Sequence, residues 1–151
     1  MLFQIHLMES MLDIFLIEDT EVIRLLIEMT LPILDFEYSP VPNPRQKEQI
    51  VGIFSQPKFL SKLLTFIKHW PQKYQPILLL FCSKLLKSKQ FLKSFFKVQG
   101  NETLFNLLNK SQYHKHRLGI LNCIKKSLNY QKFNSEYKKM GAIPILVQTL
   151  K

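Results

Sequence analysis

A stretch near the C-terminal end of this 151-residue chain repeats itself after 41 residues. Phe96–Gly100 aligns without a gap on Tyr137–Gly141, and Leu104 then falls on Ile145. A period of about 40 residues that carries two or three helices is typical of helical-repeat proteins, in which each unit buries its apolar face only against its neighbours. The chain is therefore expected to form a row of stacked helical units.

Composition and spacing both favour an all-α fold. Glycine occurs only four times, and the alternation of β-branched and polar residues that marks strands is nearly absent. Hydrophobic residues make up 46% of the chain, which is ordinary for a globular protein and too high for a disordered one. A chain of this length fits one domain and can bury a sizeable core.

Apolar residues at helical spacing predict a leading pair of helices, over Leu2–Ile17 and from Asp19 to Leu34, before a proline-rich loop over Phe36–Pro44. Pro32 is expected to kink the second helix or to end it early. A short, a medium and a long helix then follow, and the same order begins again twice. The expected ranges are Arg45–Ser55, Pro57–His69 and Gln72–Ser88, then Phe91–Val98, Glu102–Asn109 and Tyr113–Leu128, and finally Phe133–Met140 and Ile143–Leu150.

Two further expectations concern the turns and the core. Gly100 and Gly141 each stand between a short helix and the next, where a sharp turn needs a residue that tolerates positive φ. The apolar stripes of the helices are expected to face the core. Their members are Leu60, Leu63, Leu64, Ile77, Leu80, Phe81, Leu104, Leu107, Leu118, Leu121, Ile124 and Leu146.

The stretch Glu136–Leu150, EYKKMGAIPILVQTL, closely resembles the passage from the first to the second helix of an armadillo repeat. In that family a GAIP-x-L element opens the second helix, and residues 141–144 and 146 match it. The resemblance is good over residues 89–151, fair over 44–88 and architectural over 1–35. It implies a single domain, a right-handed α-solenoid of about three armadillo-like repeats with the last one incomplete. The units would be a leading helix pair over 1–35, repeats over 44–88 and 89–129, and a partial repeat over 130–151.

The segment Leu118–Ile124 is similar to the third helix of the family, which often carries a Trp four residues before an Asn. Asn122 stands at the Asn position, and Leu118 replaces the Trp. The resemblance implies a concave groove lined by third helices that holds an extended peptide. The groove residues would be Lys115, Asn122 and Lys126 on one helix face, and Lys84 and Lys87 from the preceding repeat. The alternative is that these residues form only the solvated face of an amphipathic helix, which contains the same residue types.

Charge is unevenly distributed along the chain. Residues 1–41 hold eight acidic residues and one basic residue, a net charge of −7, whereas residues 42–151 hold 20 basic and three acidic residues, a net charge of +17. A lysine-bearing groove would repel basic peptides and favour acidic ones. The basic region also leaves a nucleic-acid partner open, although lysine far outnumbers the arginine that base-edge recognition favours. Because alanine is scarce and lysine abundant, part of the basicity is also explained by an AT-rich coding bias.

Motifs for catalysis, metal binding and cofactor binding are missing from the sequence. It contains no glycine-rich phosphate loop, no Gly-x-Ser-x-Gly element and no zinc-like spacing, and His114 and His116 are two residues apart and cannot share one ion on a helix. Cys82 and Cys123 are expected to be reduced core thiols. No segment reaches the roughly 20 apolar residues of a membrane-spanning helix. No targeting signal is recognised, so we expect a cytoplasmic or nuclear protein without cofactor.

The two extremities of the sequence bear on assembly. An armadillo array that stops one helix short of a full repeat would leave Ile145, Leu146 and Leu150 without a covering helix. Either the chain is part of a longer solenoid, or a partner or another copy covers these residues. The sequence thus predicts a non-catalytic scaffold within a larger assembly that binds other proteins through acidic or extended segments. Self-association and nucleic-acid binding are the alternatives.

Overall fold

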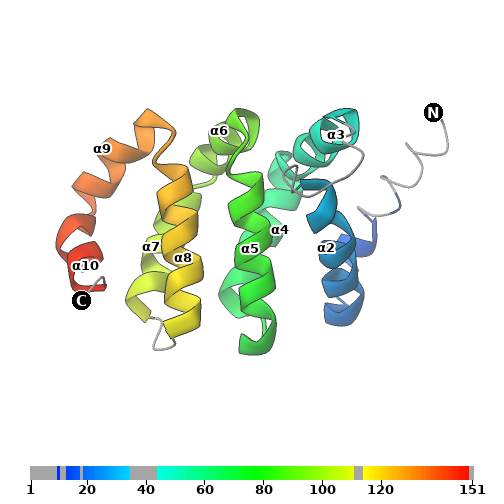
Figure 1. Ribbon diagram of the computed structural model, residues 1–151, viewed down its shortest axis with the longest axis horizontal. Coiled ribbons are helices and arrows are strands. Elements are labelled where there is room, and N and C mark those ends of the chain that lie inside the picture. Colours follow the sequence, from blue (N-terminus) through cyan, green and yellow to red (C-terminus); the bar gives the residue numbers. More distant parts are fainter. Residues whose placement is uncertain (1–9, 11–12, 18, 35–43, 111–113, 150–151) are drawn as a thin grey trace.

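The computed structural model describes residues 10, 13–17, 19–34, 44–110 and 114–149 (Figure 1). The described residues contain helices and no strand, which confirms the predicted all-α class. Residues 13–16 are helical as well. The named helices are α2 (Thr20–Leu34), α3 (Pro44–Phe54), α4 (Pro57–His69), the 3₁₀ helix η1 (Gln72–Tyr74), α5 (Gln75–Leu85), α6 (Lys89–Lys97), α7 (Gly100–Lys110), α8 (His114–Ser127), α9 (Gln131–Lys139) and α10 (Ala142–Thr149).

Helices that are three apart in the chain pack against each other. Helix α2 contacts α5, α5 contacts α8, α3 contacts α6, and α4 contacts α7. In Figure 1 the helices α2, α5 and α8 stand side by side in one layer, α4 and α7 lie behind them, and α3, α6 and α9 follow one edge of the molecule. These contacts bring helices from separate parts of the sequence together in layers.

Local signals explain where several helices begin and end. The carboxylate of Asp19 accepts hydrogen bonds from the backbone N–H groups of Glu21 and Val22, at 3.0 and 3.1 Å, and so caps the first turn of α2. Pro57 occupies the first turn of α4, where its missing N–H costs nothing. Helix α4 ends at His69, and its bounds are those that the sequence predicted.

Two prolines bear on where helices α2 and α5 begin and end. Helix α2 runs two residues past Pro32, so Pro32 does not end it early. The predicted helix Gln72–Ser88 is wrong at both ends, because η1 occupies its first turn and α5 covers only Gln75–Leu85. Pro76 explains the late start, since a helix from Gln72 would need an N–H at residue 76 to bond the Gln72 carbonyl.

The two predicted turn glycines have different roles. Gly141 has φ +66°, which confirms the expectation of a left-handed turn residue. Gly100 does not have a positive φ. The positive φ before α7 belongs to Gln99, at 56°, and Gly100 is the first residue of the helix. A Cβ at Gly100 would lie 2.5–2.6 Å from the ring carbons of Phe95. Glycine is thus needed there for space and not for backbone conformation.

Aromatic rings form much of the core. Phe15 packs against Phe54 and Phe66 with ring centroids 5.3 and 5.2 Å apart, which ties residues 13–16 to α3 and α4. Further along, Phe95 of α6 meets Phe133 of α9 at 6.2 Å. All five rings are buried, and their contacts join helices that are distant in sequence.

Most, but not all, of the predicted core residues are inside. Leu60, Leu63, Leu64, Phe81, Leu104 and Ile124 are buried. The residues Ile77, Leu107, Leu121 and Leu146 are half-buried and pack against the core. The prediction is wrong for Leu80 and Leu118, which expose 44% and 53% of their surface. Both belong to faces of α5 and α8 that no further helix covers among the described residues.

The length and hydropathy of the helices differ from those of a membrane span. Within the described residues, no single helix is long and apolar enough to cross a membrane. Helices α3 and α4 reach the required length and hydropathy only when they are taken together, and they are bent by 75° at the break between them.

Candidate protein-interaction surface

The candidate surface is built where α5 and α8 approach closely. A Cβ added to Gly119 would lie 3.0–3.2 Å from side-chain atoms of Leu79, so the glycine lets the two helices come together. One turn further along α8, the Cys123 thiol donates a hydrogen bond to the Leu79 carbonyl oxygen at 3.2 Å. This contact fixes the position of α8 against α5 and thereby the relative placement of their exposed faces.

Two exposed leucines flank this contact. Leu80 follows Leu79 on α5, and Leu118 precedes Gly119 on α8. Both belong to faces that the core does not cover. Large apolar side chains that are exposed next to each other on neighbouring elements are a feature of interaction sites more than of ordinary solvated surface.

The residues predicted to line a groove are found on the same two helices. Asn122 is exposed one turn after Leu118, and Lys126 is half-buried one further turn along α8. Lys84 is half-buried one turn after Leu80 and has polar interactions of its own, and Lys87 is exposed just beyond the end of α5. The side chain of Lys115 lies outside the described residues.

Sequence reasoning missed Leu80 and Leu118 as surface residues and placed them in the core. A signal was present for Leu118, because it lies four residues before Asn122 and therefore shares its helix face. An exposed Asn122 implies an exposed Leu118. No such signal exists for Leu80, because α5 carries apolar residues on nearly every side. Lys125, which is exposed on α8, was not singled out either.

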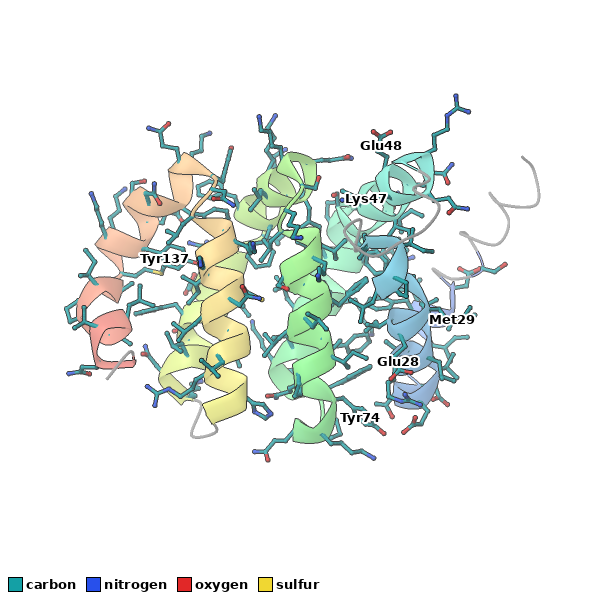
Figure 2. The ribbon with its side chains drawn as sticks, in the orientation of Figure 1. Glu28, Met29, Lys47, Glu48, Tyr74 and Tyr137 are labelled. Atoms are coloured by element: carbon teal, nitrogen blue, oxygen red, sulfur yellow. The ribbon has the colours of Figure 1, made fainter. Side chains whose placement is uncertain are left out.

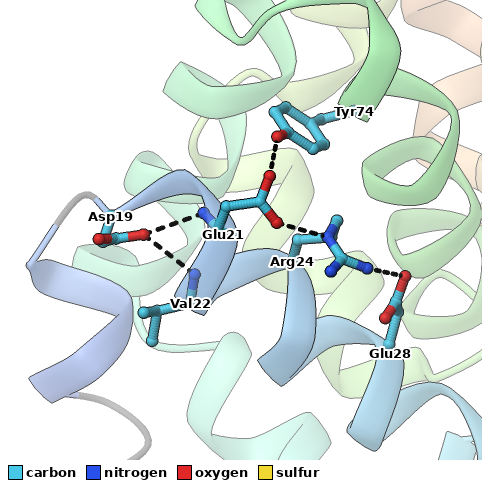
Figure 3. A network of polar contacts seen from close by, with 6 residues as sticks. All are labelled: Asp19, Glu21, Val22, Arg24, Glu28 and Tyr74. Carbon is cyan, nitrogen blue, oxygen red and sulfur yellow. Dashed lines mark hydrogen bonds and ion pairs between the residues drawn. The ribbon is translucent and has the colours of Figure 1, made fainter.

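A polar network joins α2 to the start of α5 at the border of this surface (Figure 3). The Tyr74 hydroxyl donates to one carboxylate oxygen of Glu21, and the Nε of Arg24 donates to the other at 2.9 Å. Arg24 also reaches Glu28 through Nη1 at 2.5 Å. The network contains two carboxylates and one guanidinium, so this edge of the surface, on α2, is acidic. The faces of α5 and α8 carry lysines instead.

Protonation follows from these contacts. The Tyr74 hydroxyl, with help from Arg24, holds the pKa of Glu21 below its usual range. Two carboxylates, Glu21 first and then Glu28, raise the pKa of Arg24. Contact with Tyr74, whose ring centroid lies 4.5 Å from the Lys73 Nζ, raises the pKa of Lys73. Glu21, Arg24 and Lys73 are therefore charged at neutral pH.

Behind the surface lies a small buried polar cluster. Cys82 and Cys123 are free and fully buried, as predicted. Their mutual contact, followed by burial, raises the pKa of the Cys123 thiol. Ser127 lies 3.0 Å from the Tyr137 hydroxyl, which reaches α8 from α9 (Figure 2), and burial raises the pKa of Tyr137. The Cys123 thiol and the Tyr137 phenol therefore stay neutral at neutral pH, and their contacts hold α8 against α5 and α9. In the described residues no group of three or more His, Cys, Asp or Glu side chains could hold a metal ion.

The residues predicted to lack a covering helix lie on or next to α10. Ile145 and Leu146 are half-buried against the core, and Leu150 lies outside the described residues. The exposed apolar side chains of α10 are instead Ile143 and Val147.

Comparison with protein-family models, with curated proteins and with solved structures finds no match for this chain.

Proposed function

We propose that this chain is a non-catalytic scaffold of armadillo-like repeats, arranged as a right-handed solenoid of about three units, which binds another protein through the exposed face of α5 and α8. The observation that carries the proposal is the pair of exposed leucines, Leu80 and Leu118, on adjacent helices with lysines one or two turns away. An apolar centre with a polar, solvent-accessible rim is the usual anatomy of a protein-binding site. The setting would be the cytoplasm or the nucleus.

The chemistry of the partner follows from the surface. Lys84, Lys87 and Lys126 favour a negatively charged segment, and an exposed Asn122 offers both a donor and an acceptor to a peptide backbone. The axes of packed helices lie roughly 8–10 Å apart. An extended peptide advances about 3.3 Å per residue. Because successive side chains of an extended peptide alternate between its two sides, two apolar side chains that are two residues apart lie on one side, about 7 Å from each other. A segment with this spacing among acidic residues would reach Leu80 and Leu118 together.

The test is a binding measurement with such peptides. Fluorescent acidic peptides with two leucines at spacings from one to five residues are titrated with the protein, and anisotropy gives the affinity. We expect the tightest binding at a spacing of two residues, and a loss of at least about tenfold in Leu118→Ser or Leu80→Ser, since a buried leucine contributes roughly 1.5–3 kcal/mol. Leu128→Ser is the matched control, because Leu128 is exposed just after α8 and more than two turns from Leu118. Equal affinity for all spacings and variants would contradict the proposal.

A second candidate function rests on a different surface. Lys89, Lys93 and Lys97 are all exposed and recur every four residues on α6, and Lys132 of the adjacent α9 is exposed as well. Like charges at this spacing repel each other, and a polyanion would relieve the repulsion. If nucleic acid binds here, its affinity should fall steeply with salt and should decrease when Lys93 and Lys97 are changed to Gln. The leucine variants of α5 and α8 would leave that binding unchanged.

A further inference from the structure

Helix α2 carries an exposed apolar stripe on the side that faces away from α5. Val22, Leu25 and Met29 expose 40%, 49% and 71% of their surface, and their spacing of three and four places them on one face. In Figure 2 Met29 lies on the side of α2 that faces away from α5. Ile17, just before the helix, is exposed as well. A contiguous apolar face of this kind marks a contact surface.

The opposite end of the row carries a second apolar face. Ile143 and Val147 are four residues apart on α10 and expose 57% and 51% of their surface. Both therefore lie on one side of the helix, away from Ala142, which is buried, and from Ile145, which packs against the core. Figure 1 shows α2 and α10 at opposite ends of the row of labelled helices.

The two faces have opposite electrostatic surroundings. Around α2, Asp13, Asp19, Glu21 and Glu28 are all exposed. Of the bases near them, Arg24 is bonded to Glu21 and Glu28, and Lys73 lies near Glu21. On the described part of α9 and α10 the exposed charges are lysines. The acid there, Glu136, is half-buried and accepts a hydrogen bond from Asn101 at 2.5 Å. The exposed lysines are Lys132, Lys138 and Lys139.

The packing of α5 shows that a helix in this layer can be covered on two sides. Helix α5 uses one side against α2 and another against α8, so a helix of this layer is built to pack on both sides. Helix α2 contacts α5 and α3, and the apolar stripe is a side that stays exposed. We propose that a second copy of the chain covers this stripe with its α10 end, so that molecules associate head to tail. The contact is heterologous, and repetition of it would extend the row. It goes beyond the proposed function, because it uses neither Leu80 nor Leu118.

The experiment uses one variant at each face. Met29→Lys places a charge in the α2 stripe, and Val147→Lys places one in the apolar face of α10. Both positions are exposed, so the fold should be retained, and circular dichroism would verify this. The mass of the 151-residue chain and of each variant is measured by sedimentation over a wide range of concentrations. Leu80→Lys is the control, since it also places a lysine at an exposed leucine but belongs to neither face. We expect the wild type and Leu80→Lys to form species larger than the 17.9 kDa monomer, and each face variant to remain a monomer.

A mixture of the two face variants gives the decisive result. Met29→Lys keeps an intact α10 face and Val147→Lys keeps an intact α2 face, so a mixture should form a dimer of about twice 17.9 kDa and nothing longer. A mixture that stays monomeric would overturn the head-to-tail contact. So would a wild type that remains monomeric at millimolar concentration, or a face variant that dimerises alone. None of these outcomes bears on peptide binding at Leu80 and Leu118, which is measured separately.

Discussion

Gly100→Ala separates two explanations of a glycine at a helix start. The methyl group would lie 2.5–2.6 Å from the ring of Phe95, which is fully buried and held by Phe91 and Phe133. Overpacking of this kind typically costs about 1–3 kcal/mol. Replacing glycine by alanine reduces the entropy of the unfolded chain and offsets about 0.4–1 kcal/mol of that cost. We therefore expect a net destabilisation of about 1–2 kcal/mol, or roughly 2–8 °C in melting temperature.

A double-mutant cycle with Phe95→Leu tests the cause. If the ring is the obstacle, the smaller side chain at position 95 makes room for the methyl group, and the cost of Gly100→Ala should fall by at least about 0.5 kcal/mol in that background. Gly141→Ala is the control, because nothing lies within 4 Å of its Cβ and its φ of +66° makes the cost a backbone one. That cost should be the same whether position 95 holds phenylalanine or leucine. Chemical denaturation of the wild type, the variants of the cycle and the control gives the values. An unchanged cost of Gly100→Ala in the Phe95→Leu background would refute the steric explanation.

Three hydrogen bonds lead to further predictions. Asp19→Ala removes the cap of α2 and should lower the free energy of unfolding by about 0.5–2 kcal/mol, which denaturant titration would measure. Tyr74→Phe removes the hydroxyl that lowers the pKa of Glu21, so an NMR titration should show that pKa rising towards its usual value. A carboxyl group whose pKa is lowered in the folded state stabilises the fold only above its unfolded pKa. The difference in stability between the variant and the wild type should therefore vanish as the pH falls through the titration of Glu21. Tyr137→Phe removes a buried hydrogen bond to Ser127, whose hydroxyl still donates to the Ile124 carbonyl, and should lower the free energy of unfolding by about 0.5–1.5 kcal/mol. In the wild type the Tyr137 phenol should resist ionisation at alkaline pH, as ultraviolet absorbance would show.

Local signals in the sequence were enough to predict the helical class, the bounds of α4 and the turn at Gly141. Pro57 at a helix start and Trp70–Pro71 after its end act through the backbone within a few residues, and so their effect does not depend on distant parts of the chain. A glycine with positive φ is likewise a local requirement.

The role of each side chain in a packed row was decided only by tertiary structure. Gly100 is required because the ring of Phe95 occupies the space above it, and no local rule predicts that contact. Leu80 belongs to α5, and a helix that is apolar on nearly every side does not reveal which side its neighbours will cover. Burial is a property of the assembled layers, and hydrophobic spacing records only that a face needs covering. The exposed faces of α5, α8, α2 and α10, on which both proposals rest, are therefore a product of the fold.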